Sequence, residues 1–136
     1  MAAPAAEVRV GIASDDDVVA ARQAGRRLAE SLGLGATDLT LVATAISEVA
    51  RNITAYAGSG EIVVRRVDVR GRSGVQVVAY DEGPGIADIE RALQDGYTTG
   101  GGLGIGLPGA RRLMDDFSIS SSEGGTTVTM TKWGPE

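Results

Sequence analysis

The stretch Asp81-Glu82-Gly83-Pro84-Gly85-Ile86 directly follows an apolar run, residues 75–80, that predicts a buried strand. A strand that ends in an acid and then breaks into Gly-Pro-Gly presents that acid at the edge of a sheet. We therefore expect Asp81 to be a hydrogen-bond acceptor at the mouth of a pocket. Gly83 and Gly85 carry no Cβ, so the backbone there can approach a bound group closely. Taken alone, the hexapeptide could equally be an acidic surface loop.

The length and composition predict a single globular domain over residues 1–136. A chain of 136 residues is long enough to bury a core, and its hydrophobic content of 43% is ordinary for a globular protein. No apolar run reaches the roughly 18 residues of a transmembrane helix, so we expect no membrane partner. Residues 1–6 have neither the basic residue nor the apolar core of a secretory signal. They read as a short disordered segment.

The missing residue types exclude several kinds of chemistry. The chain has no cysteine, so it has neither a disulfide framework nor a thiolate metal site. It has no histidine, which excludes a Ser-His-Asp triad, an imidazole ligand and a phosphohistidine. The formal net charge of −5 argues against nucleic acid as the main partner. Together these features are those expected of a cytoplasmic protein.

The periodicity of the chain predicts an α/β fold. The first half predicts a strand at 7–12, a helix capped by Ser14 and ended by Gly33, and a helix from a Thr37 cap to Tyr56. Strands at 61–69 and 75–80 follow, joined by a loop at 70–74. The second half predicts a short helix within 86–93, a helical segment at 110–117, and strands at 118–122 and 126–133 that turn at 123–125. Three aspartates after Ser14 fit a helix start better than a metal site. The order predicts a mixed, mostly antiparallel sheet with helices on one face, an α+β two-layer sandwich.

The second predicted helix carries a polar pair beside its apolar stripe. The stripe consists of Leu39, Val42, Ile46, Val49, Ile53 and Tyr56. Glu48 and Asn52 lie four residues apart and so share one face of the helix. Taken alone, this pair is more simply explained as two surface residues. We expect Arg51 to face either solvent or an acidic partner.

A glycine-rich segment precedes the third predicted helix. Six glycines fall within residues 100–109, which makes this stretch a poor core element and a good mobile loop. A glycine loop that opens a helix is also an anion site, because free N–H groups point at the ligand. A linker would have a similar composition. Here, however, glycines alternate with Leu103, Ile105 and Leu107, which could pack the segment onto the sheet as a lid.

A phosphate ligand would need a metal ion, since several negative charges must be offset. The chain has neither a Walker lysine nor a carboxylate cluster with metal-ligand spacing. The amide oxygen of Asn52 is a suitable Mg²⁺ contact, with phosphates and water in the other positions. Glu48, one turn away, could then polarise a hydroxyl or water that attacks a γ-phosphate.

Four segments together resemble the motifs of the GHKL ATPases, the group that contains gyrase and the sensor histidine kinases. Glu48-Val49-Ala50-Arg51-Asn52 is similar to their N box, and Asp81 to Gly85 resembles the first glycine box. Gly100 to Gly106 resembles the second, and Gly124-Gly125-Thr126-Thr127 the third. The four occur in the family's order and cover essentially the whole chain.

This resemblance implies the Bergerat ATP-binding fold, with ATP and Mg²⁺ as cofactors. It implies that Asp81 holds the adenine amino group with help from Thr126, that Asn52 binds Mg²⁺, and that Glu48 is the general base. The other cofactor-binding positions that it implies are Gly83, Gly85, Ile86, Gly100, Gly101, Gly102, Leu103, Gly104, Ile105 and Gly106.

Within this group, the chain looks most like the switch kinases of the bacterial stressosome. The matching segments include 17–23, 47–58, 95–97 and 104–117. Such kinases phosphorylate serine or threonine on STAS-domain scaffold and antagonist proteins, and once released they activate a PP2C-type phosphatase. The related anti-sigma kinases usually carry a histidine shortly after the N-box asparagine, where this chain has Ala55-Tyr56-Ala57. Arg111 and Arg112 are candidates to stabilise the γ-phosphate, although ordinary solvated helix residues would look the same.

Two hypotheses of different classes follow. The first is a serine/threonine kinase that acts on a small protein partner. The second is a binding module, an anti-sigma factor that docks its partner in an ATP-dependent way with little turnover. Glu48 favours the kinase, since binding alone needs no base. A complete sensor histidine kinase is excluded because the chain has no phosphoacceptor histidine.

Overall fold

The computed structural model of the chain describes residues 7–83 and 106–135. Its elements are β1 (Glu7–Ile12), α1 (Asp15–Ser31), α2 (Ala36–Tyr56), β2 (Gly60–Val69), β3 (Arg72–Asp81), α4 (Gly106–Leu113), β4 (Asp116–Ser122) and β5 (Gly125–Trp133). Three expectations lie outside the described residues: the disorder of residues 1–6, the short helix within 86–93, and the lid formed by residues 100–105.

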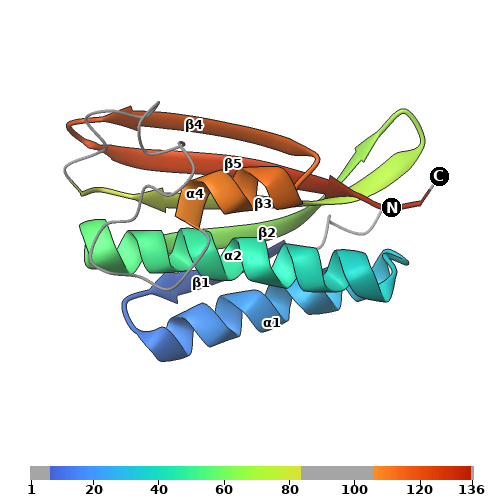
Figure 1. The fold of residues 1–136 in the computed structure, drawn as a ribbon, viewed down its shortest axis with the longest axis horizontal. Helices are drawn as coiled ribbons and strands as arrows, with labels where there is room; N and C mark the ends of the chain where they lie inside the picture. The colour runs from blue at the N-terminus through green and yellow to red at the C-terminus, as the bar shows by residue number, and fades with distance from the viewer. Residues whose placement is uncertain (1–6, 84–105, 136) are drawn as a thin grey trace.

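The described strands form one sheet in the order β1-β2-β3-β5-β4, and every neighbouring pair is antiparallel. The helices α1, α2 and α4 lie side by side over one face of this sheet (Figure 1). The predicted α/β sandwich with helices on one face is therefore confirmed. Within the described part of the chain, no helix is both long and apolar enough to cross a bilayer.

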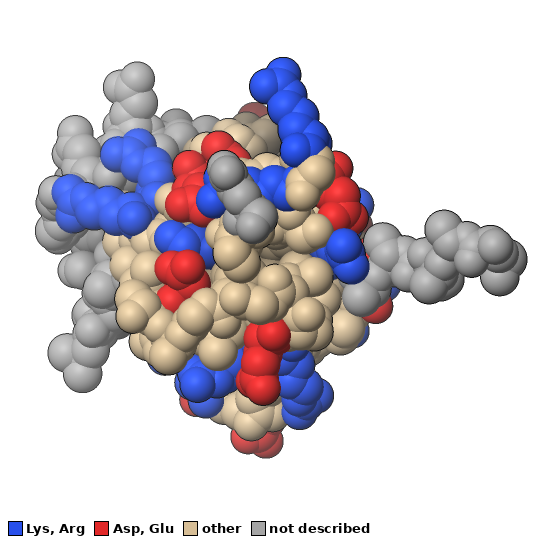
Figure 2. Space-filling model, turned by 90° about the vertical axis from the view of Figure 1, so that its right-hand side faces the viewer, with Lys and Arg blue, Asp and Glu red and all other residues tan. Residues whose placement is uncertain are grey.

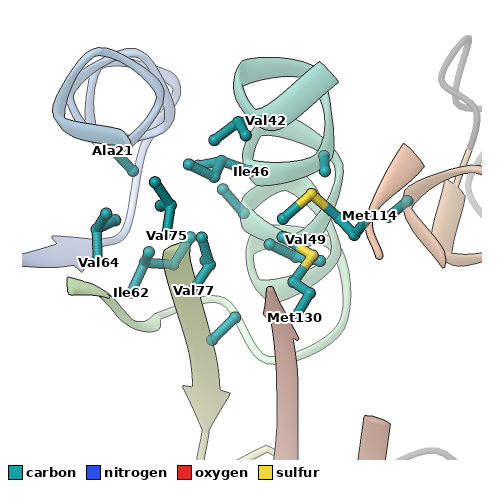
Figure 3. Close-up of a cluster of buried hydrophobic side chains, with 14 of the residues drawn as sticks. Ala21, Val42, Ile46, Val49, Ile62, Val64, Val75, Val77, Met114 and Met130 are labelled. Atoms are coloured by element: carbon teal, nitrogen blue, oxygen red, sulfur yellow. The ribbon is translucent and has the colours of Figure 1, made fainter. Parts of the chain in front are cut away.

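The core fills the space between the helical layer and the inner face of the sheet. Val42, Ile46 and Val49 on α2 and Val75 and Val77 on β3 belong to one cluster of buried side chains (Figure 3), and all five are almost fully buried. Each such side chain contributes about 1.5–3 kcal/mol by leaving water. Burial of the alternate residues of β3 on this face sets its register, because a slip by one residue would turn them to the opposite face.

Helix α1 begins and ends as predicted. The Oδ2 atom of Asp17 accepts hydrogen bonds from the backbone N–H groups of Ala13 and Ser14, at 2.9 and 3.1 Å, and so satisfies free donors at the helix start. Gly33 follows the helix with a φ of +84°, the left-handed conformation that ends many helices. Asp15, Asp16 and Asp17 lie in the first turn of this helix.

Helix α2 starts earlier than predicted, so the assignment of Thr37 as its cap is wrong. Gly35 is the N-cap, and its carbonyl accepts the Leu39 N–H at 2.9 Å. Ala36 is a strong helix former, which favours the earlier start. At the other end, Tyr56 is the last residue of the helix as predicted, but its side chain is 39% exposed and does not belong to the core.

Both hairpins have longer strands and tighter turns than predicted. The expected loop at 70–74 is a two-residue turn, in which Arg70 and Gly71 have φ values of +53° and +78°. Strand pairing extends to Val69 and Arg72 because cross-strand hydrogen bonds outweigh the weak strand propensity of glycine and serine. The second hairpin similarly turns within residues 123–124.

Helix α4 begins at Gly106, not within the predicted segment 110–117. Leu107 and Pro108 are buried in its first turn, where proline is tolerated because the N–H that it lacks would have no helical partner. The expectation that residues up to Gly109 form a mobile loop is therefore wrong for residues 106–109. The helix ends at Leu113, and Phe117 belongs to strand β4.

Candidate active site

Glu48 lies on α2 and is almost completely buried, with 5% of its surface exposed. Its Oε2 atom accepts a hydrogen bond from Nη1 of Arg51 at 2.7 Å, and its Oε1 atom accepts one from the backbone N–H of Gly106 at 3.0 Å. A buried carboxylate is stable only when it is paired or hydrogen-bonded, and these two donors meet that requirement. They also fix the orientation of the carboxylate, while each oxygen retains a further lone pair.

Asn52 lies one turn after Glu48 on α2 and is half-buried. The i,i+4 spacing places its side chain on the same side of the helix as the buried carboxylate. Mg²⁺ binds through few protein ligands and completes its shell with phosphate oxygens and water. A single amide oxygen beside a carboxylate fits that mode of binding and does not fit a site made of protein ligands alone.

Asp81 is the last residue of β3, and its side chain lies on the same face of the sheet as the buried Ala79. Its Oδ1 atom accepts the backbone N–H of Gly83 at 2.9 Å, which turns the chain away from the strand. Thr126 on β5 lies directly opposite Asp81 in the register and is 5% exposed. The Oγ atoms of Thr126 and Ser121 are 2.8 Å apart, so the threonine hydroxyl has a hydrogen-bond partner.

Three glycines from different segments pack around Asp81. A Cβ atom at Gly60 would lie 3.1 Å from Cβ of Asp81, and one at Gly83 would lie 3.1 Å from its Oδ1 atom. At Gly125, where φ is +145°, a Cβ would lie only 2.0 Å from the carbonyl oxygen of Asp81. These positions require glycine because any other side chain would displace the end of β3.

The same contacts bring Asp81 to the end of α2. A Cβ at Gly60 would meet Cγ2 of Ile53 at 2.8 Å, and one at Gly83 would meet Cβ of Ala57 at 2.6 Å. Residues 81–83, the described part of the segment that resembles the first glycine box, thus lie beside the last two turns of the helix that carries Glu48 and Asn52.

The structure therefore brings the described candidate residues to one end of the sandwich. Those residues are Glu48, Asn52, Asp81, Gly83, Gly106 and Thr126. The remaining candidates, Gly85, Ile86 and Gly100 to Ile105, lie outside the described residues. Arg111 and Arg112 are both exposed on α4.

Some contacts of this site were not predicted. The sequence left open whether Arg51 faces solvent or an acidic partner. Its i,i+3 spacing from Glu48 indicates the ion pair that the structure contains. The contact between Glu48 and Gly106 joins residues far apart in the chain, and no local pattern indicates it. The hydroxyl pair of Ser121 and Thr126 follows from the register of β4 and β5, which the sequence does not fix.

On the outer face of the sheet, next to Asp81, lies a charged network. The hydroxyl of Tyr80 donates to Oε1 of Glu61 at 2.6 Å, and Arg9 Nη1 donates to the same atom at 2.9 Å. The Tyr80 hydroxyl, together with Arg9, lowers the pKa of the Glu61 carboxyl against the opposing effect of desolvation. The hydrogen bond to Glu61 in turn raises the pKa of Tyr80.

Comparison with known families identifies the arrangement. The histidine kinase-like ATPase domain family matches residues 12–132, nearly the whole described fold. The chain belongs to this family. It is 51% identical over 125 residues to the serine/threonine-protein kinase RsbT of Bacillus subtilis, a match that covers 91% of this chain and 94% of RsbT. The predicted membership of the GHKL ATPases is thereby confirmed.

Two further matches place this histidine kinase-like ATPase domain among related proteins. The anti-sigma F factor of Bacillus licheniformis is 39% identical over 101 residues, covering 70% of this chain and 69% of that factor. A solved structure of the RsbU and RsbW domains of Rv1364c from Mycobacterium tuberculosis superimposes with a TM-score of 0.66 and 21% identity. It covers 98% of this chain and 34% of the longer chain, and it supports the fold alone.

Proposed function

We propose that this chain is the switch kinase of a bacterial stress-signalling pathway. It uses ATP and Mg²⁺ to phosphorylate serine or threonine on STAS-domain scaffold and antagonist proteins. When released from them, it activates a PP2C-type phosphatase in the cytoplasm. The class of activity, ATP-dependent serine/threonine kinase, is established by the family and by the 51% identity to RsbT. We propose in addition the STAS-domain and phosphatase partners, the use of Mg²⁺ and the cytoplasmic location.

The burial and the hydrogen bonds of Glu48 are the observation that best supports the proposal. Glu48 is a buried carboxylate held by two donors, one helical turn from Asn52, and a pure binding module does not need a positioned base. In a kinase, Glu48 accepts the proton of the substrate hydroxyl as that hydroxyl attacks the γ-phosphate. Its orientation by Arg51 and Gly106 removes part of the entropic cost of reaching the attacking geometry.

The nucleotide would be held at the other side of the site. Asp81 would accept the adenine amino group through Oδ2, because Oδ1 already accepts the Gly83 N–H. Thr126 would assist from the neighbouring strand. Asn52 would hold Mg²⁺, which supplies positive charge against the phosphate oxygens when it is bound. The positions with Gly85, Ile86 and Gly100 to Ile105 would complete the nucleotide contacts.

A phosphotransfer assay tests the proposal. The chain is mixed with a STAS-domain protein and radiolabelled ATP-Mg²⁺, and label on serine or threonine is measured. We expect Glu48→Gln to bind ATP as the parent does and to transfer phosphate about 10²–10⁴-fold more slowly. Tight ATP-dependent docking of a partner without transfer would favour the alternative, an anti-sigma factor.

A further inference from the structure

We propose that the turn end of the β2–β3 hairpin is a docking surface for an acidic segment of a protein partner that is not the phosphoacceptor. We define this hairpin surface as Val69, Arg70, Gly71, Arg72 and Trp133. These residues line a pocket of about 440 Å³. The identity of the partner rests on the proposed function, whereas the surface itself does not.

The charge of the hairpin differs from that of the chain. Residues 65–72 contain four arginines and one aspartate, while the whole chain carries a formal net charge of −5. The aspartate, Asp68, is already paired with Arg66 at 3.1 Å. Among the described residues, no carboxylate forms an ion pair with Arg70. The hairpin end is thus a basic site on an acidic protein, which is complementary to an acidic segment.

The backbone at Arg70 is costly for an arginine. Its φ of +53° makes it the only described residue other than glycine with a positive φ. A two-residue hairpin turn of this kind favours asparagine or glycine at that position. Left-handed backbone in a residue with a Cβ is strained, and such strain often marks a functional position. Arg70 therefore occupies a position where folding alone would select a different residue.

Apolar surface accompanies the charge. Val69 is 50% exposed, and the half-buried indole of Trp133 packs against Gly74, where a Cβ would lie 2.8 Å from Cε3. The indole is fixed by the hydrogen bond from its Nε1 atom to Asp116 at 2.8 Å. Rigid aromatic and arginine side chains around a pocket are typical of the centre of a protein interface.

The surface fits a protein segment better than nucleic acid. The end of the molecule that includes the hairpin shows basic and acidic side chains interspersed around an uncharged area (Figure 2). A phosphate backbone favours a continuous basic face, whereas a protein partner can match a small basic site with carboxylates next to an apolar residue. We therefore assign the surface to an acidic protein segment.

The surface lies at the opposite end of β3 from Asp81. The hairpin turn precedes Arg72, the first residue of β3, and Asp81 is the last. Ten strand residues at about 3.3 Å each separate the two by about 30 Å. A segment bound at the hairpin is therefore remote from the Asp81 end of the candidate site, and it need not carry the serine or threonine that is phosphorylated. We therefore assign the surface to the partner that binds without being phosphorylated, the PP2C-type phosphatase of the proposed function.

Substitution of Arg70 by glycine gives a test with opposite effects on folding and binding. In Arg70→Gly the turn strain is relieved, so we expect the Tm to rise by roughly 2–5 °C. We expect the affinity for the purified phosphatase to fall about fivefold or more, and further in Arg70→Glu, by calorimetry at low and moderate salt. Arg27→Gln, on the exposed side of α1, should change neither quantity.

The outcomes separate this inference from the proposed function. Transfer to the STAS-domain protein should be unchanged in Arg70→Gly, and absence of transfer in the parent protein would overturn the proposed function itself. Unchanged phosphatase affinity in both Arg70 variants would overturn the inference. An equal loss of phosphotransfer and of phosphatase binding would also overturn the inference. The same holds if a 20-mer oligonucleotide (about two turns of duplex) binds in a way that depends on Arg70 while the phosphatase affinity is intact.

Discussion

Gly125 packs against the backbone of Asp81 so closely that a Cβ at position 125 would lie 2.0 Å from the Asp81 carbonyl oxygen. Its φ of +145° also disfavours any other residue. We expect Gly125→Ala to lower the free energy of unfolding by about 2–4 kcal/mol, as measured by urea denaturation. Gly11→Ala is the matched control, because a Cβ there meets nothing within 4 Å. Equal stability of the two variants would contradict this account of the Asp81 environment.

Asp81→Asn tests the adenine contact. The substitution keeps the size of the side chain but makes it a poorer acceptor for an exocyclic amine. A hydrogen bond that involves a charged group contributes about 1.5–3 kcal/mol, so the Kd for ATP should rise roughly tenfold or more in calorimetry. Glu82→Gln, an exposed neighbour, is the control. ATP affinity equal to that of the parent, in a folded variant, would refute the assignment.

Asn52→Ala should damage nucleotide binding and phosphotransfer together, unlike Glu48→Gln. The reason is that Asn52 would hold the metal that accompanies the phosphates. The measurement is ATP affinity with and without Mg²⁺. The variant should lose most of the affinity that Mg²⁺ adds in the parent. If Mg²⁺ strengthens ATP binding equally in parent and variant, Asn52 is not a metal ligand.

Arg51→Gln should slow phosphotransfer by about tenfold with little change in KM for ATP. The guanidinium orients Glu48 from 2.7 Å, and a misplaced catalytic group can cost about 100-fold in rate. The Arg51 side chain is 57% exposed, so the variant should fold. Arg51→Lys should restore part of the rate because an ammonium group can still reach the carboxylate. Equal rates in Gln and Lys variants would argue that the ion pair does not act on the base.

The network of Tyr80 and Glu61 should make stability depend on pH. The folded-state pKa of Glu61 is lowered, first by the Tyr80 hydroxyl, so its stabilising effect is present above the unfolded pKa of about 4.3. This effect is lost as the pH falls through the lower, folded value. We expect Tyr80→Phe to be less stable than the parent at pH 7, with a difference that shrinks toward pH 3. Urea denaturation at both pH values measures it, and an equal difference at both would contradict the linkage.

At high pH, the same pair should make the protein less stable as the pH rises. The folded-state pKa of Tyr80 is raised by its hydrogen bond to Glu61. Its contribution is complete below the unfolded pKa of about 10 and is lost as the pH rises through the higher, folded value. Between these two limits, the difference between parent and Tyr80→Phe should be flat.

The elements with a strong local pattern were predictable from the sequence. The apolar stripe from Leu39 to Ile53 predicted α2, and the apolar strand patterns after Glu61 predicted the hairpin of β2 and β3. Element boundaries were less predictable where opposing preferences compete. Proline and glycine at 108–109 indicated a loop, but burial of Leu107 outweighed them and the helix begins at Gly106.

The candidate site was predictable only in part for a similar reason. Glu48 and Asn52 could be paired from their spacing on one helix, and Asp81 from its place after a strand. Burial of Glu48 depends on Gly106, which reaches it across the fold. Such a contact is set by packing of α2 against α4, and local sequence patterns contain no information on it.

The position of β5 in the sheet order has a consequence for folding kinetics. This strand lies between β3 and β4, so β3 must find a partner that is far away along the chain. Closing such a long loop is slow, whereas the β2–β3 hairpin and the two long helices form from local contacts. Thr126 reaches Asp81 only when this late pairing is made. A nucleotide held between them would bind only the fully paired sheet, and it would slow unfolding without speeding folding.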